Sequence, residues 1–246
     1  MAYNGCHSGE ELTIMPSDDL TNLLRKWPLE RGGVQARVVK ADDGRDILQV
    51  RLDLGILQMD MDGRPDGGPS ERERLLDTGE VMPLDGDACR LLREEAVQRS
   101  HRGAACLTLG LWEMVVRDAS ATLEILDLCR GRGVSEADQT ALEPFRGSAI
   151  AMRARARAEW AVEHGQRPAA LSAIDTGLEE LAAALGEAGG ERSHEALMLR
   201  ALRQSLTRRL PVSERADLRE RLQGAIDAQN FELAAILRDE LRLLRG

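Results

Sequence analysis

The side chains that could bind a metal or act as nucleophiles are scattered along this sequence. They are His7, His101, His164 and His194 together with Cys6, Cys89, Cys106 and Cys129. No CxxC pair occurs, and Cys6-His7 has no second pair of ligands to complete a zinc site. The patterns GxxxxGK[ST], GxGxxG and HExxH, which cradle phosphates or hold zinc, are also missing. We therefore expect no catalytic residues, no metal and no cofactor, and a protein that is not an enzyme.

The acidic segment DMDGRPDG offers oxygen ligands of the kind that calcium prefers. Asp60, Asp62 and Asp66 lie beside glycines in this segment. Their spacing differs from that of the EF-hand calcium loop, and no glutamate closes the segment at the required place. A solvated turn is the favoured interpretation.

The segment MRARARAEWA is rich in arginine, which binds nucleic-acid phosphates. Helical spacing places Arg153 and Arg157 on one face and Arg155 roughly opposite. A strip for single-stranded nucleic acid would align several arginines with aromatic rings between them, and only Trp160 lies near. We interpret the segment as an exposed helix face with charge pairs four residues apart.

Composition supports a soluble, acidic protein with an aliphatic core. The 246 residues are 43% hydrophobic but only 2% aromatic, so Leu, Val, Ile and Ala must build the core, which favours helices. The net charge of −9 argues against a protein that wraps duplex nucleic acid. The first fifteen residues lack the basic and apolar regions of a secretory signal, and no apolar run approaches the roughly 20 residues that span a bilayer. We expect a cytoplasmic protein with no membrane partner and reduced, mostly buried cysteines.

Hydrophobic periodicity changes along the chain and predicts a mainly α fold. A short helix is expected from Asp19 to Trp27, and apolar alternation over 34–61 around the turn at Asp43-Gly44 predicts a β-hairpin. After Gly55 the alternation continues either as a third strand or as a bulged continuation of the second. After Asp85 the pattern is helical throughout. The expected organisation is a flexible tail (1–15), a small β-containing domain (16–69), a linker (70–84), a helical domain (85–210) and a two-helix hairpin (211–246).

The helical domain contains a repeated pattern of small residues, a glycine turn and an apolar helix. Gly110 and Gly165 mark the two turns, and Trp112 follows the first. This pattern resembles the tetratricopeptide (TPR) repeat, although the glycines lie 55 residues apart and that repeat has a period of about 34. A plain stack of antiparallel helices without superhelical geometry remains the alternative.

The C-terminal segment predicts an antiparallel hairpin with an apolar seam and a second apolar face. Ser213 and Asn230 are placed to cap its two helices. The seam is predicted from 3.6-residue spacing to contain Leu218, Leu222, Ile226, Phe231, Ala234 and Leu241. Leu233, Ile236 and Leu243 are displaced from that seam, and a hairpin this small cannot bury two faces. We therefore predict that these three residues are buried against a protein partner, the hairpin of another copy or the helical body.

The sequence LQGAIDAQNFELAAILRDELRLL resembles the UVR motif, which is named from the bacterial excision-repair proteins. The matching elements are Phe231-Glu232, Ala234-Ala235 and Leu237-Arg238-Asp239, while Ile236 replaces the usual polar residue. The resemblance implies an antiparallel helical hairpin that mediates protein–protein contact, as between two subunits of the excision-repair proteins and in stress-protease adaptors.

Together these features favour a non-enzymatic adaptor or scaffold that binds proteins through the hairpin and the helical domain. The alternative is an accessory factor in DNA repair or the stress response that associates with nucleic acid or a nuclease complex. An enzyme is the third class, and no group of residues supports it.

Overall fold

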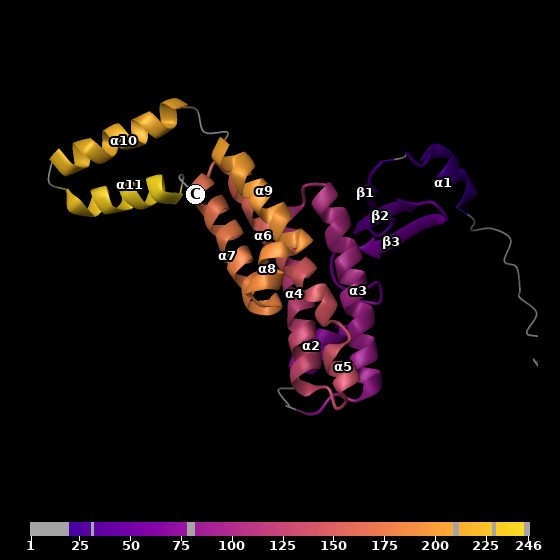
Figure 1. Ribbon diagram of the computed structural model, residues 1–246. Coiled ribbons are helices and arrows are strands. Elements are labelled where there is room, and N and C mark those ends of the chain that lie inside the picture. Colours follow the sequence, from indigo (N-terminus) through magenta and orange to yellow (C-terminus); the bar gives the residue numbers. More distant parts are fainter. Residues whose placement is uncertain (1–19, 31, 78–81, 209–211, 228–229, 244–246) are drawn as a thin grey trace, which may run out of the picture.

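The computed structural model describes residues 20–30, 32–77, 82–208, 212–227 and 230–243, and within them the chain is mainly helical (Figure 1). The elements are α1 (Thr21–Lys26), β1 (Gln35–Lys40), β2 (Asp46–Leu52), β3 (Gly55–Asp60), α2 (Glu71–Asp77), α3 (Gly86–Thr108), α4 (Trp112–Arg132), α5 (Glu136–Thr140), η1 (Glu143–Phe145), α6 (Arg146–Glu163), α7 (Arg167–Leu185), α8 (Glu187–Arg192), α9 (His194–Arg208), α10 (Val212–Asp227) and α11 (Phe231–Leu243). The predicted fold class, mainly α with a small N-terminal β element and a C-terminal two-helix hairpin, is confirmed.

The N-terminal sheet is an antiparallel meander in the order β1-β2-β3. The predicted Asp-Gly turn joins its first two strands, since Gly44 has a φ of +86° and its N–H donates to the carbonyl of Ala41 over 2.9 Å. Leu48 and Val50 on β2 are buried in one cluster with Ala105 of α3. One face of the sheet therefore packs on α3, so the β element shares a core with the helices.

The helical body is a stack in which helices close in sequence pack together: α3 on α4, α4 on α6, α6 on α7 and α7 on α9. The turns at Gly110 and Gly165 have the same geometry, with φ values of +71° and +70°. The N–H of the next residue, Leu111 or Gln166, donates to the carbonyl five residues earlier over 2.9 or 2.7 Å. Both helices thus end in a Schellman arrangement, which favours glycine. The repeated turn is observed, and TPR superhelical geometry stays a prediction.

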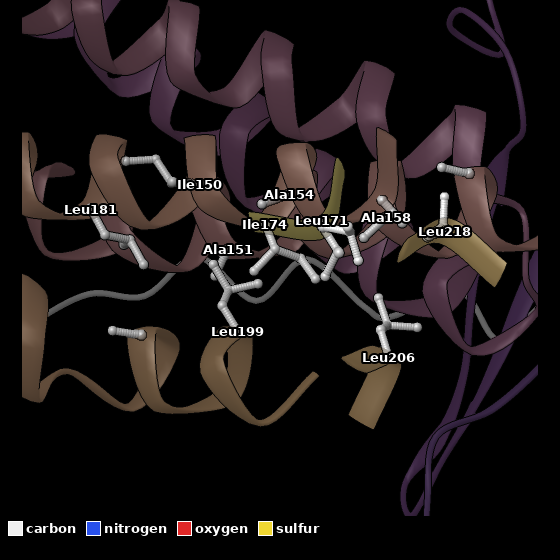
Figure 2. Packing of buried hydrophobic residues seen from close by; sticks show 14 of the residues in the cluster. Ile150, Ala151, Ala154, Ala158, Leu171, Ile174, Leu181, Leu199, Leu206 and Leu218 are labelled. Atoms are coloured by element: carbon white, nitrogen blue, oxygen red, sulfur yellow. The ribbon is translucent and has the colours of Figure 1, made fainter. Parts of the chain in front are cut away.

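Small residues let the helices of the body approach closely. Ala154 and Ala158 of α6 belong to one buried cluster with Ile174 of α7 and Leu199 of α9 (Figure 2). A Cβ atom on Gly177 of α7 would lie only 2.4 Å from the Cβ of Ala154. Because the interhelical space is this narrow, alanine and leucine fill it in place of aromatic rings.

Short helices lie in the predicted linker and between α7 and α9. The predicted linker (70–84) holds α2, whose start is a capping box: the Glu73 N–H donates to Ser70 Oγ over 3.3 Å, and the Ser70 N–H donates to Glu73 Oε2 over 2.9 Å. The segment between α7 and α9 holds the short helix α8. A Cβ on Gly190 of α8 would lie 2.5 Å from the Cα of Ala182 in α7, so glycine serves a close helix contact there and not a turn.

A buried carboxylate on α4 joins the sheet to the helices. Asp118 is 1% exposed and accepts hydrogen bonds from Arg102 of α3 over 2.7 and 2.6 Å. Arg99, also on α3, approaches the same carboxylate at 3.3 Å. Arg102 also donates to the backbone carbonyl of Asp60, the last residue of β3, over 3.0 Å. Asp118 therefore holds a guanidinium that clamps the end of the sheet onto α3.

Neighbouring arginines hold the segment that follows β3. Arg117 of α4 donates to the carbonyl of Met61 and to the carboxylate of Asp62, each over 2.7 Å. Glu95 of α3 accepts from Arg99 over 2.7 Å and from the Arg72 backbone N–H, at the start of α2, over 3.0 Å. The loop between β3 and α2 is thus fixed to α3 and α4 by charged hydrogen bonds.

We predict that Asp118→Asn lowers the free energy of unfolding by about 3–5 kcal/mol, because it leaves the guanidinium of Arg102 buried without a countercharge. Asp62→Asn is the matched control, since the Asp62 side chain is 90% exposed in its pair with Arg117 and should contribute at most about 1 kcal/mol. Urea denaturation followed by circular dichroism measures both variants. Equal effects of the two changes would contradict the role given to Asp118.

Candidate protein-interaction site in the C-terminal hairpin

Helices α10 and α11 pack against each other and project from the body beside α7 and α9 (Figure 1). The predicted cap of the second helix is present, because the N–H of Leu233 donates to Asn230 Oδ1 over 3.1 Å. The Asn230 N–H donates to the carbonyl of Ala225 over 2.9 Å, which ties α11 to the end of α10. The hairpin is attached to the body at one end, and the end of α10 and the start of α11 lie at the far end (Figure 1).

The seam between the two helices is aliphatic. Leu218, Ala225, Ala234, Leu237 and Leu241 are buried in the same cluster as the core of α6 and α7, and Leu222 is half-buried against it. The predicted seam residues Leu218, Leu222, Ala234 and Leu241 thus lie in the seam, which also contains Ala225 and Leu237.

Two residues predicted for the seam are exposed, and the prediction for them is wrong. Phe231 is 70% exposed and Ile226 is 44% exposed. Both lie next to the turn, where α10 has ended at Asp227 and gives Phe231 no facing helix turn to pack against. The smaller Ala225 and Ala234 close the seam at this end.

Two of the three residues predicted for the second face are exposed to solvent. Leu233 is 40% exposed and Ile236 is 60% exposed, while the side chain of Leu243 lies outside the described residues. We name Leu233 and Ile236 the outer face of the hairpin. Apolar side chains that stay in solvent beside one another are typical of surfaces that contact another protein.

The acidic residues considered as calcium ligands form separate ion pairs. The carboxylates of Asp60, Asp62 and Asp66 bind Arg45, Arg117 and Arg64, in that order. Side-chain hydrogen bonds from Arg64 and the backbone N–H of Gly68 lower the pKa of Asp66 to about 2. Among the described residues, no three His, Cys, Asp or Glu side chains gather in a way that could hold a metal. Cys6 and His7 lie outside the described residues.

The arginine segment on α6 does not form a strip. Arg153 pairs with Glu180 of α7 at 2.7 Å, and Arg155 lies 3.9 Å from Glu159 on its own helix. Only Arg155 pairs with a residue four positions along its own helix, and the exposed Arg157 makes no ion pair with any described residue, so the predicted pairing within the helix is present in part.

The described cysteines are buried thiols. Burial raises the pKa of Cys106 to about 11 and that of Cys129 to about 12, and it also raises the pKa of Cys89. Because the thiolate is the reactive form, these thiols stay protonated and unreactive near neutral pH.

Comparison with known protein families identifies the motif in the hairpin. Residues 213–246 match the family described as the UvrB/uvrC motif, or UVR. The hairpin carries a UVR motif. In proteins of the UvrB/UvrC type this motif mediates protein interactions. No curated protein and no solved structure matches the chain. In the described part of the chain, no helix is long and apolar enough to cross a membrane.

We predict that Leu237→Ala and Phe231→Ala have unequal effects on the hairpin. Leu237 is 2% exposed, so its truncation should cost about 2–5 kcal/mol, whereas that of the exposed Phe231 should cost less than about 1 kcal/mol. Amide hydrogen exchange of α10 and α11 in the full chain measures both. Equal loss of protection in the two variants would show that Phe231 is also part of the seam.

Proposed function

We propose that this protein is a non-enzymatic adaptor that binds a protein partner through the outer face of its UVR hairpin. The observation that supports the proposal is the pair of large aliphatic side chains, Leu233 and Ile236, on a hairpin attached to the body at one end. The seam buries the other apolar face of α11, so a partner can cover the outer face without opening the hairpin.

The helical body serves as the support in this proposal. Residues Leu218, Leu237 and Leu241 share a buried cluster with the core of α6 and α7, so the hairpin is anchored to the stack. A fixed base reduces the conformational entropy that a docking surface loses when it binds.

A direct test is capture of partners by the full-length chain, with wild type compared to Ile236→Glu. A carboxylate at position 236 would be desolvated in the contact, so capture should fall about thirtyfold or more, while the seam and the thermal melt stay unchanged. Leu54→Glu is the matched control, because Leu54 is fully exposed at the β2–β3 turn, far from the hairpin. Equal capture by Ile236→Glu and Leu54→Glu would refute the role of the outer face.

Nucleic-acid binding is a competing class with its own test. The net charge of −9 opposes association with phosphates, so we predict no salt-sensitive binding to duplex or single-stranded DNA near physiological ionic strength. Electrophoretic mobility shifts at increasing salt measure this. Sub-micromolar binding that weakens steeply with salt would instead favour an accessory factor that associates with nucleic acid.

A further inference from the structure

Helices α4 and α6 form a small apolar pocket away from the hairpin. It has a volume of about 240 Å³ and is lined by Trp112, Glu113 and Val116 of α4 and by Arg157 and Trp160 of α6. Two of the three tryptophans of the chain lie in its walls. An apolar cavity of about 150 Å³ in another protein binds benzene, so this pocket has room for one aromatic ring.

The walls of the pocket are fixed, and its polar groups lack partners. The Trp160 ring stacks on His164 with 4.0 Å between the ring centroids. The Nε1 atom of Trp112 is buried and has no hydrogen-bond partner in the described structure. Arg157, which is exposed, and Glu113 make no ion pair with any described residue. The pocket therefore offers preformed aromatic walls and a free cation and anion at its rim.

The chain itself presents a ring of matching size. Phe231 is 70% exposed at the start of α11, and the exposed Asp227 is the last residue of α10. Successive residues of a helix turn by about 100°, so Phe231 lies about 140° around α11 from Ile236 of the outer face. Phe231 is thus separate from the outer face, and Asp227, at the end of α10, carries a charge opposite to that of Arg157.

Within one molecule the two elements are kept apart. The end of α10 and the start of α11 lie on the side away from the body, and α7 and α9 stand between the hairpin and α4 (Figure 1). We propose that Phe231 of one copy inserts between Trp112 and Trp160 of a second copy, with Asp227 paired to Arg157. Aromatic rings stabilise one another in offset-stacked or edge-to-face contacts. The contact joins unlike surfaces, so it is head-to-tail and can extend from copy to copy.

The test is a complementation experiment with full-length chains in analytical ultracentrifugation. Wild type should show a mass that rises with concentration beyond that of a dimer. Phe231→Ala lacks the inserted ring and Trp160→Ala lacks the pocket, so each alone should self-associate about thirtyfold or more weakly. An equimolar mixture of the two keeps one intact pair of surfaces and should form a 1:1 dimer that stops there.

Arg157→Glu serves as a second pocket variant whose exposed side chain leaves the core untouched. It should also weaken self-association and be rescued by adding Asp227→Arg to the same chain. A wild type that stays monomeric at every concentration, or a mixture that fails to pair, would overturn the proposal. Self-association that persists in both pocket variants would show that another surface mediates it. The partner-capture test with Ile236→Glu is independent of these outcomes. If self-association through Phe231 is not found, the proposed adaptor function is therefore unaffected.

Discussion

The carboxylate of Asp118 is the interaction on which the N-terminal half of the structure depends. It is buried in α4, and it holds Arg102 of α3 so that the same guanidinium reaches the end of β3. A small sheet of this kind is stabilised by a hydrophobic face that packs against a helix. The ion pair fixes that face against α3, and the aliphatic cluster around Leu48 then supplies the burial.

The C-terminal half follows a different constraint, which is the distance between helices. With few aromatic residues, the core gains its packing by bringing backbones close together, as at Gly177 against Ala154 and at Gly190 against Ala182. Close approach increases the number of dispersion contacts but leaves no room for even one added methyl group. Small residues also allow close packing in the hairpin, where alanines fill the seam next to the turn.

The sequence predicted what depends on local pattern and missed what depends on distant contacts. The glycine turns, the Asp-Gly hairpin and the Asn230 cap follow from residues adjacent in the chain, and all three are present. The burial of Asp118 could not be predicted, because its partner lies on another helix and nothing in the local pattern distinguishes this aspartate from a surface one. Phe231 was misplaced for a related reason. Helical spacing gives the direction of a side chain but not the point at which the facing helix ends.

The division of the hairpin into buried and exposed residues affects how its sequence can evolve. Its stability resides in Leu218, Leu237 and Leu241 near the body, whereas Leu233, Ile236 and Phe231 remain exposed. Substitutions at the exposed positions have small effects on the free energy of unfolding, so these positions can change during evolution while the fold is retained. Duplicated copies of such a chain can therefore diverge in what they recognise while their architecture stays the same.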